Sequence, residues 1–254
     1  MEIVACAKLV YDETQIPVEG DRLLVDQAPV KVSDIDRNAI EEAVRIKEEV
    51  GGRVTLALVV TGPFDEAILK ETLAMGADRA LMVQGDEVRG HNPYRTAQAL
   101  VKAIEREGIR PDLVICGEGS SDQYSCALPA MVAEFMSLPV ATFVGRMELG
   151  EGKLRVERYL EGGYEIVEVP LPAVISVTSE INEPRIPTVL QIMRAGKRER
   201  SVVDASQLGL DYPEMEEIEM KAYVRERLRK RIEGDVNEAV RRIVEVLEEK
   251  GVIP

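Results

Sequence analysis

The stretch that decides the fold is residues 53–83, which read RVTLALVV (53–60), TGPFDEAILKETLAMGAD (61–78) and RALMV (79–83). Residues 53–60 are a near-continuous apolar run, as expected of a parallel strand that is covered on both faces. Residues 63–75 predict a helix that ends at Gly76, and residues 79–83 predict the next strand. A strand, a helix and a strand in this order form a βαβ unit.

The same alternation continues on both sides of this unit. Residues 3–10 and 112–116 predict further buried strands, and residues 36–50, 94–107 and 125–136 predict helices. Strands and helices that alternate so regularly predict an α/β fold with a doubly wound, mostly parallel sheet.

The pattern changes after Pro139. Residues 154–159 and 164–169 alternate with a period of two around Glu161, Gly162 and Gly163, which predicts a β-hairpin, and residues 173–178 predict another strand. Residues 182–196 contain two prolines and little periodicity, so we expect a long exposed loop. Residues 235–250 predict an amphipathic last helix. We therefore divide the chain into an α/β domain, residues 1–203, and a C-terminal helical arm, residues 204–254.

The composition is that of an ordinary globular protein of 254 residues, with 45% hydrophobic and 31% charged residues. A net charge of −14 disfavours binding to nucleic acids and to anionic membranes. The cysteines Cys6, Cys116 and Cys126 lack the spacing of a disulfide framework or a zinc site. The chain has neither a signal-peptide pattern nor an apolar run of the ~20 residues that span a bilayer. We therefore expect a cytoplasmic protein without direct membrane insertion, whose association with any membrane is made through partners.

The loop after residues 112–116 reads GEGSSDQYS (117–125) and joins a strand to a helix. Ligands of such sheets bind beyond the carboxyl ends of the strands. Two glycines allow close approach of the backbone, and amides at a helix N-terminus hold phosphates. The alternative is an ordinary turn in which Asp122 or Ser125 caps the helix. The loop has neither the dinucleotide G-x-G-x-x-G pattern nor a Walker pattern.

Side chains for acid–base catalysis are scarce. The single histidine, His91, lies in a Gly-His-Asn-Pro turn, where we expect it to be solvated, and it has no partners for a catalytic triad or a metal site. Asp34 and Asp36 are expected to cap the following helix. Nucleotide-site features without acid–base residues suggest a carrier or a sensor, in which a cofactor performs any redox chemistry.

A second segment, residues 183–190, places apolar residues between prolines, and Arg194, Lys197, Arg198 and Arg200 follow it. Exposed apolar side chains with charges around them are typical of a contact with a partner protein. The alternative is a loop that folds back on its own domain.

Several stretches, in this order, resemble the beta subunit of electron-transfer flavoproteins over nearly the whole chain. They are CAK (6–8), NAIEEAVRIK (38–47), AMGADRA (74–80), GEGSSDQYS (117–125), EGGYE (161–165), LPAV (171–174) and NEPR (182–185). The resemblance implies a Rossmann-like fold of the adenine nucleotide alpha hydrolase type. It also implies a heterodimer with an alpha subunit that carries an electron-transferring FAD.

In this family the beta subunit binds AMP or, in electron-bifurcating members, a second FAD. By position, the resemblance assigns this pocket to Cys6, Ala7, Ser33, Asp34, Ile35, Asp36, Thr61, Gly117, Glu118, Gly119, Ser120, Ser121, Asp122, Gln123, Tyr124, Ser125, Cys126, Ala127 and Leu128. It assigns a loop that recognises partner dehydrogenases to Glu183, Pro184, Arg185, Val189 and Leu190. Val189 stands where many members have an anchoring leucine, and Ser33 and Asp34 replace the usual Asn-Pro.

The choice between AMP and FAD rests on residues 117–125. AMP-type loops read Gln-x-x-Asp followed by acidic and polar residues, whereas GEGSSDQYS is similar to the nitrogen-fixation and carnitine-related branch. That branch works with a quinone oxidoreductase and a ferredoxin-like subunit. The similarity favours FAD, with NADH as the electron donor. It implies electron bifurcation between a quinone-side acceptor and a low-potential ferredoxin or flavodoxin.

Two other classes of protein share the α/β layout. An adenine-nucleotide sensor of the universal-stress type would need neither the proline-rich loop nor the C-terminal arm. A ligase of the ATP-pyrophosphatase type needs a Ser-Gly-Gly-x-Asp-Ser loop after the first strand, where this chain has Lys8, Leu9, Val10 and Tyr11. The sequence therefore disfavours the ligase.

Overall fold

The sheet is built around β1 (Glu2–Ala7), which lies between parallel neighbours on both sides. The computed structural model describes residues 1–211, 215, 217–223, 231–232 and 234–253. Six parallel strands lie side by side up to one edge of the sheet, in the order β12 (Ala173–Val177), β8 (Leu113–Gly117), β1, β6 (Arg53–Val59), β7 (Arg79–Gln84) and β13 (Glu199–Asp204). This order confirms the predicted doubly wound α/β fold.

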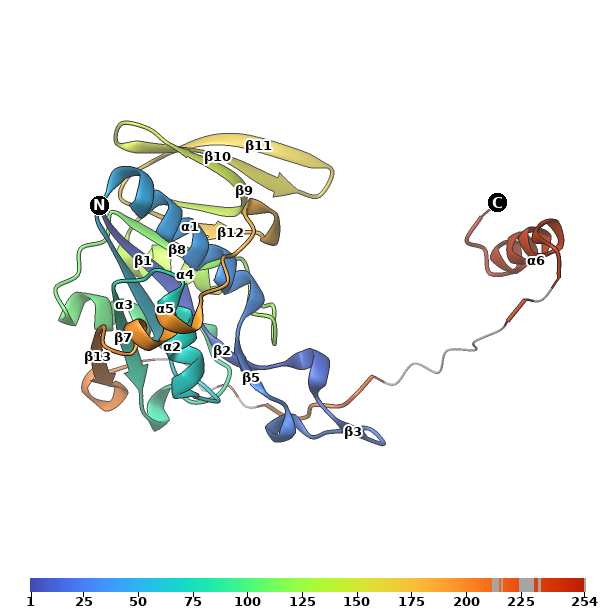
Figure 1. Ribbon diagram of the computed structural model, residues 1–254, viewed down its shortest axis with the longest axis horizontal. Coiled ribbons are helices and arrows are strands. Elements are labelled where there is room, and N and C mark those ends of the chain that lie inside the picture. Colours follow the sequence, from blue (N-terminus) through green and yellow to red (C-terminus); the bar gives the residue numbers. More distant parts are fainter. Residues whose placement is uncertain (212–214, 216, 224–230, 233, 254) are drawn as a thin grey trace.

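Three further strands continue the sheet beyond β12 (Figure 1). They are β9 (Val140–Leu149), β10 (Lys153–Leu160) and β11 (Gly163–Pro170). β9 runs parallel to β12, and the three strands then form an antiparallel meander. The pairing of Tyr159 with Tyr164 confirms the predicted hairpin. Neither β9 nor β13 was predicted from the sequence.

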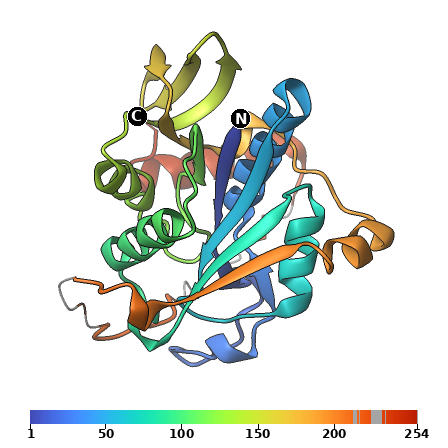
Figure 2. The same cartoon turned by 90° about the vertical axis from the view of Figure 1, so that its left-hand side faces the viewer.

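Helices cover both faces of the sheet (Figure 2). One core joins the sheet to α1 (Asp34–Val50), α2 (Glu66–Ala74) and the meander. The core on the other face joins it to α3 (Pro93–Arg106) and α4 (Leu128–Met136). Because both faces are covered, β6 has six consecutive buried residues, as the apolar run at 53–60 predicted.

Capping residues determine where these helices begin. The side chain of Asp65 accepts hydrogen bonds from the amides of Ala67 and Ile68 at the start of α2. At α3, Asn92 accepts from the amide of Arg95, and Pro93 occupies the first turn. Along α3 the apolar side chains at 97, 100, 101 and 104 share one buried face.

The first predicted strand, residues 3–10, is two strands. β1 ends at Ala7, and β2 (Leu9–Tyr11) pairs with β5 (Val30–Val32) in a separate two-stranded sheet. The break falls at Lys8, whose amide donates to the carboxylate of Asp36 instead of continuing the ladder. A second small sheet, β3 (Val18–Glu19) with β4 (Arg22–Leu23), lies in the same extension.

Two predicted boundaries differ from the structure. The helix predicted at 125–136 begins only at Leu128, because Tyr124 and Cys126 have positive φ angles of 48° and 54°. The segment predicted as a loop at 182–196 contains α5 (Val189–Ala195), which packs against α2. A capping box between Thr188 and Gln191 starts this helix.

The C-terminal part begins with two residues that belong to the core. Ala205 and Leu208 are buried beside α3 and β13. The predicted last helix is α6 (Val236–Glu249), capped by Asp235, and none of its residues is buried. Figure 1 shows α6 apart from the sheet. The division at residue 204 stays a prediction. Among the described residues, no helix has the length and apolar character that crossing a membrane requires.

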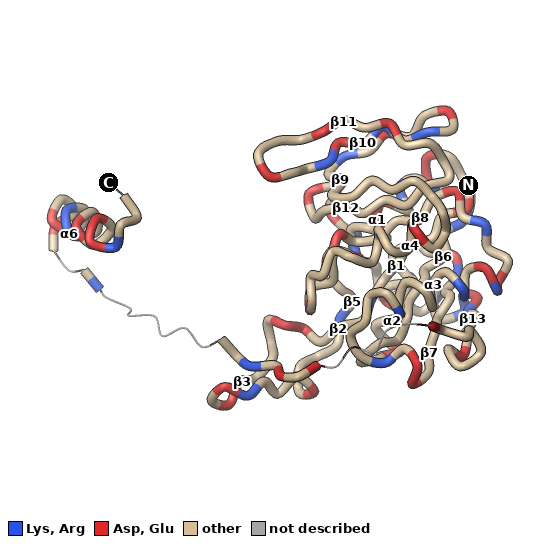
Figure 3. Tube along the Cα trace, turned by 180° about the vertical axis from the view of Figure 1, so that it is seen from behind, with Lys and Arg blue, Asp and Glu red and all other residues tan. Residues whose placement is uncertain are grey.

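Charged residues recur along the strands of the meander (Figure 3). Lys153 pairs with Glu168 across β10 and β11, and Arg158 pairs with Glu165. β11 is an edge strand, and charges along such a strand oppose pairing with other chains.

Two structural constraints require glycine at position 76, directly after α2. Its φ angle is +137°, and a Cβ there would lie 2.6 Å from Cγ1 of Val44. We expect Gly76→Ala to lower the free energy of unfolding by about 3 kcal/mol, because a strained backbone and overpacking add together. Gly108→Ala is the control, since Gly108 has a φ of +65° but open space around its Cβ position. It should cost about 1 kcal/mol. Urea unfolding followed by circular dichroism measures both, and equal losses would contradict the packing argument.

Candidate functional site

A pocket opens at the carboxyl edge of the sheet, where the strand order reverses between β1 and β8. The chain runs from β1 to β6 and β7 on one side and returns to β8 on the other, so the loops after β1 and β8 diverge here. The space inside the pocket, its open mouth included, is about 730 Å³.

The loop after β8, residues 117–127, forms one wall of the pocket. A Cβ on Gly117 would lie 2.6 Å from Oδ1 of Asp36, and a Cβ on Gly119 would lie 3.1 Å from the ring of Tyr124. Both glycines therefore permit close packing of the loop. Within the described residues, the main-chain amides of Gly119, Ser120 and Gln123 have no hydrogen-bond partner, and these three residues line the pocket.

This loop is attached to the start of α1 by reciprocal hydrogen bonds. The amide of Ser121 donates to Oγ of Ser33, and the amide of Asp34 donates to Oγ of Ser121, both at 3.2 Å. The ammonium of Lys8 forms an ion pair with Asp122 at 2.6 Å. Ser121 therefore caps α1 from a segment 87 residues away.

The capping roles expected from the sequence are wrong. Asp122 and Ser125 do not cap α4, whose N-cap is Ala127 without a side-chain hydrogen bond. Asp34 pairs with Lys31, and Asp36 accepts from the amide of Lys8 at 2.9 Å rather than capping its own helix. These carboxylates connect different segments of the chain instead.

Burial and hydrogen bonding shift the pKa values of three groups in this region. Burial raises the pKa of Asp36 to about 7, although hydrogen bonds from the amides of Lys8 and Gly117 favour its ionised form. Burial is the largest single influence on Asp122, but the hydrogen bond and the charge of Lys8 and the hydrogen bond from Ser120 together outweigh it and lower the pKa. The hydrogen bond to Glu118 raises the pKa of Tyr124 to about 12.

The wall of the pocket has polar groups without partners. Thr61 is 7% exposed, and its buried Oγ1 has no hydrogen-bond partner among the described residues. Buried polar atoms are normally satisfied, so an orphaned hydroxyl beside a pocket indicates a missing partner. The amides of residues 119, 120 and 123 are further unpaired donors in residues that line the pocket.

The predicted pocket residues fall into two groups. Those that line the cavity are Cys6, Ala7, Asp36, Thr61, Gly117, Glu118, Gly119, Ser120, Gln123, Ser125, Cys126, Ala127 and Leu128. The others do not line it: Ser33, Asp34, Ser121 and Asp122 attach the loop to its surroundings, Tyr124 packs on Gly119, and Ile35 lies behind Gly117.

Sequence reasoning missed the turn before α3. Gly90, His91, Asn92 and Pro93 line the pocket opposite the 117–127 loop, and Lys8 lies at its rim. The amide of Gly90 donates to the carbonyl of Thr61, which joins this turn to the loop after β6. His91 lies in an exposed bend, as the sequence predicted, and it also lines the pocket. Its position after the β7 strand was the signal that would have found it.

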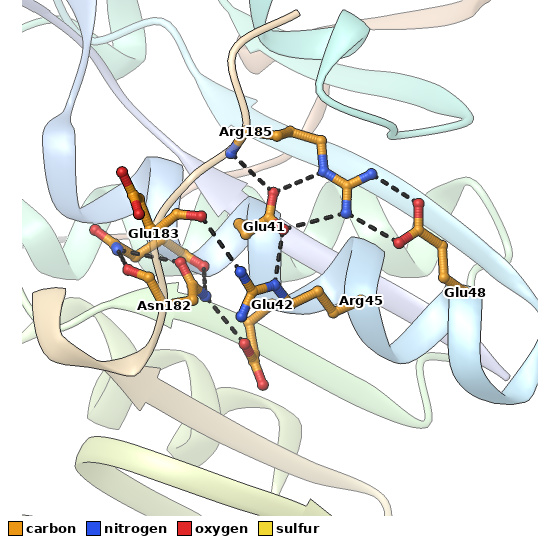
Figure 4. A network of polar contacts seen from close by, with 8 residues as sticks. Glu41, Glu42, Arg45, Glu48, Asn182, Glu183 and Arg185 are labelled. Atoms are coloured by element: carbon orange, nitrogen blue, oxygen red, sulfur yellow. Dashed lines mark hydrogen bonds and ion pairs between the residues drawn. The ribbon is translucent and has the colours of Figure 1, made fainter.

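The predicted recognition segment is bound to α1 at its base (Figure 4). Arg185 donates through Nε and Nη2 to Glu41 and through Nη1 and Nη2 to Glu48. Asn38 and Asn182 exchange hydrogen bonds, and Arg45 holds both Glu41 and the carbonyl of Glu183. The side chains at 38, 41, 45 and 48 share one face of α1. The NEPR stretch (182–185) and the NAIEEAVRIK stretch (38–47) therefore contact each other in the folded chain.

Beyond this base the segment is exposed. Ile186 is 84% exposed and Val189 75%, and Leu190 and Met193 are also exposed. The sequence left two alternatives for this segment, a contact with a partner protein and a loop that folds back on its own domain. Residues 182–185 fold back on the domain, whereas α5 exposes an apolar surface of the kind that partner contacts have. Pro184 and Glu183 lie in the attached base. Arg185 was predicted to contact a partner, yet its guanidinium is engaged within the chain.

Glu41 makes Arg185 important for stability. Its side chain is 3% exposed, and although burial opposes ionisation, hydrogen bonds from Arg185 and Arg45 lower its pKa. Arg185→Ala should lower the free energy of unfolding by about 2 kcal/mol, because a buried carboxylate loses charged donors. Glu48→Gln should cost less than about 1 kcal/mol, since Glu48 is half exposed. Chemical denaturation compares the two variants, and a larger loss from Glu48→Gln would contradict this ranking.

Comparison with known proteins gives concordant matches. The model of the electron transfer flavoprotein domain family matches residues 22–208. The electron transfer flavoprotein subunit beta of Thermoanaerobacterium thermosaccharolyticum is 35% identical over 264 aligned positions, which cover the whole of both chains. The chain therefore belongs to the electron transfer flavoprotein family.

Proposed function

We propose that this electron transfer flavoprotein beta subunit binds FAD in the pocket between β1 and β8 and functions as half of a heterodimer with an alpha subunit. The observation that carries the proposal is the set of unused donors in the pocket wall, namely the amides of Gly119, Ser120 and Gln123 and the hydroxyl of Thr61. Amides in a glycine-containing turn suit a pyrophosphate.

The residues of the chain bind and orient the nucleotide. The 117–127 loop would hold the phosphates, and Lys8 would add a positive charge at the rim. The apolar floor beneath, with Leu58, Val59 and Leu100, would exclude water. FAD, when bound, would supply the redox chemistry. Among the described residues, no cluster of His, Cys, Asp and Glu suits a metal ion.

The finer assignment is electron bifurcation, with NADH as donor and with a quinone oxidoreductase and a ferredoxin-like subunit as further partners. Its support is the GEGSSDQYS sequence of residues 117–125. The alternative is a structural AMP in the same pocket, in a subunit that passes on electrons from a dehydrogenase. The two assignments differ in the number of flavins per heterodimer.

Flavin counting distinguishes these assignments. After coexpression with the alpha subunit, we expect two FAD per heterodimer and reduction by NADH. One FAD with one AMP would contradict bifurcation, and an empty pocket would contradict the proposed nucleotide site.

Cys126 reports where the nucleotide binds, because it lines the pocket and is partly exposed, whereas Cys6 and Cys116 are buried. Bound nucleotide should slow alkylation of Cys126 by iodoacetamide at least tenfold. Unchanged alkylation at full nucleotide occupancy would show that the nucleotide binds elsewhere.

The apolar face of α6 is proposed to bind the alpha subunit. Val236, Val240 and Ile243 are exposed on one side of this helix. A large apolar face without cover indicates an interaction surface. Its attachment to a long arm suits a partner that the arm wraps around.

Deletion of residues 235–254 should abolish copurification with the alpha subunit while leaving the fold intact, because this deletion spares the buried Ala205 and Leu208. Ile243→Glu should weaken assembly at least tenfold, whereas Arg241→Glu, which changes the charged side of the helix, should not. Pull-down with a tagged alpha subunit measures assembly. An intact complex after the deletion would exclude this role.

A further inference from the structure

Asp36 is a buried carboxylate where three segments of the pocket meet. It lies in the first turn of α1, it is 7% exposed, and it lines the pocket. Its Oδ2 accepts the amide of Lys8, which ends β1, at 2.9 Å. Its Oδ1 lies against the backbone of Gly117, which ends β8, and the Gly117 amide and the Ser33 hydroxyl favour its ionised form. One side chain thus joins both strands of the switch point to the helix that follows them.

The contact with Gly117 is built into the sequence. Any Cβ at position 117 would lie 2.6 Å from Oδ1 of Asp36 and 3.1 Å from the carbonyl carbon of Ile35. Only glycine allows the carboxylate to reach the amide. The loop that continues from Gly117 includes Gly119 and Ser120, which line the pocket and whose amides have no partner among the described residues.

The ionised carboxylate is the form that makes all of these contacts. A carboxylate accepts several hydrogen bonds, whereas a protonated carboxyl group carries a donor on one oxygen. Since Asp36 faces two amide donors, a proton on either oxygen opposes one of them. Protonation therefore loosens either Lys8 or Gly117.

Other charged groups around Asp36 do not replace this contact. The ammonium of Lys8 acts on it electrostatically but forms its ion pair with Asp122. The thiol of Cys116 faces it from β8, and burial and its hydrogen bond with Cys6 hold the pKa of that thiol above its usual range. Burial raises the pKa of Asp36 itself to about 7, so it changes charge near neutral pH.

We propose that Asp36 is a positioning residue whose ionised carboxylate holds the loops after β1 and β8 in their nucleotide-binding arrangement, so that nucleotide affinity depends on its deprotonation. The inference rests on the proposed nucleotide site and goes beyond it by assigning a proton-coupled role. Its sign is distinctive: acidification weakens binding. Simple repulsion between Asp36 and a ligand phosphate would have the opposite effect, because protonation would then strengthen binding.

The test is titration of the heterodimer, stripped of the nucleotide in this pocket, with FAD and with AMP between pH 6 and pH 8. If only the ionised form binds, the apparent dissociation constant should rise about tenfold from pH 8 to pH 6, in proportion to the loss of that form. Asp36→Asn should bind about tenfold more weakly at pH 8 and show no pH dependence in this range. Asp86→Asn, which changes a 95% exposed carboxylate that pairs with Arg89 and does not line the pocket, should behave as wild type.

A second measurement does not depend on the variant folding or on a nucleotide. Hydrogen exchange at the amides of Lys8 and Gly117 in the wild-type complex, corrected for the intrinsic effect of pH, should show protection that falls between pH 8 and pH 6. Nucleotide binding that ignores pH, or strengthens on acidification, would overturn the inference and leave the proposed function standing. Failure of wild type to bind either nucleotide would overturn both, and constant protection would overturn the inference alone.

Discussion

Helix α1 supports both of the surfaces that we assign to function, and it does so with polar side chains along one helix. At its start, Ser33 and Asp36 hold the loops after β8 and β1. Further along the helix, Glu41 and Glu48 hold Arg185 at the base of the segment that leads to α5. Ala39, Ile40, Ala43 and Val44 bury one face of α1 in the core, and Asp36 stands on that same face, three and four residues before Ala39 and Ile40. This packing keeps the polar side chains of the helix in place.

Much of the fold follows from hydrophobic periodicity. The strands that are buried on both faces, β6 above all, are near-continuous apolar runs, and the helices between them have clear ends. β13 was missed because it is an edge strand with Glu199, Arg200 and Ser201 at its start, so it lacks an apolar run. β9 alternates only in part, because Phe143 has a positive φ and the pairing with β10 shifts register near Arg158. Local pattern does not carry such tertiary information.

The site was predictable where it depends on topology and not where it depends on long-range contacts. A loop with two glycines after a buried strand identified residues 117–128, since ligands bind beyond the carboxyl ends of the strands. The capping of α1 by Ser121 joins residues 87 apart, and no local signal indicates it. For the same reason Arg185 was assigned to a partner, although its charge is used by Glu41, 144 residues away. From the sequence alone, a charged residue in an exposed segment does not reveal whether it pairs within its own chain or with a partner protein.

The distribution of exposed apolar residues argues that the chain is incomplete by itself. The meander exposes paired charges such as Lys153 and Glu168 together with apolar side chains such as Tyr164 and Ile166. Two helices expose more: α5 exposes Val189 and Met193, and α6 exposes Val236 and Val240 without a buried residue along its length. An amphipathic helix gains most of its stability from packing its apolar face. For α6 the described residues of this chain offer no such packing. A second subunit is the surface that would complete it, and the attached base of the α5 segment would hold the other apolar surface in a constant place on the domain.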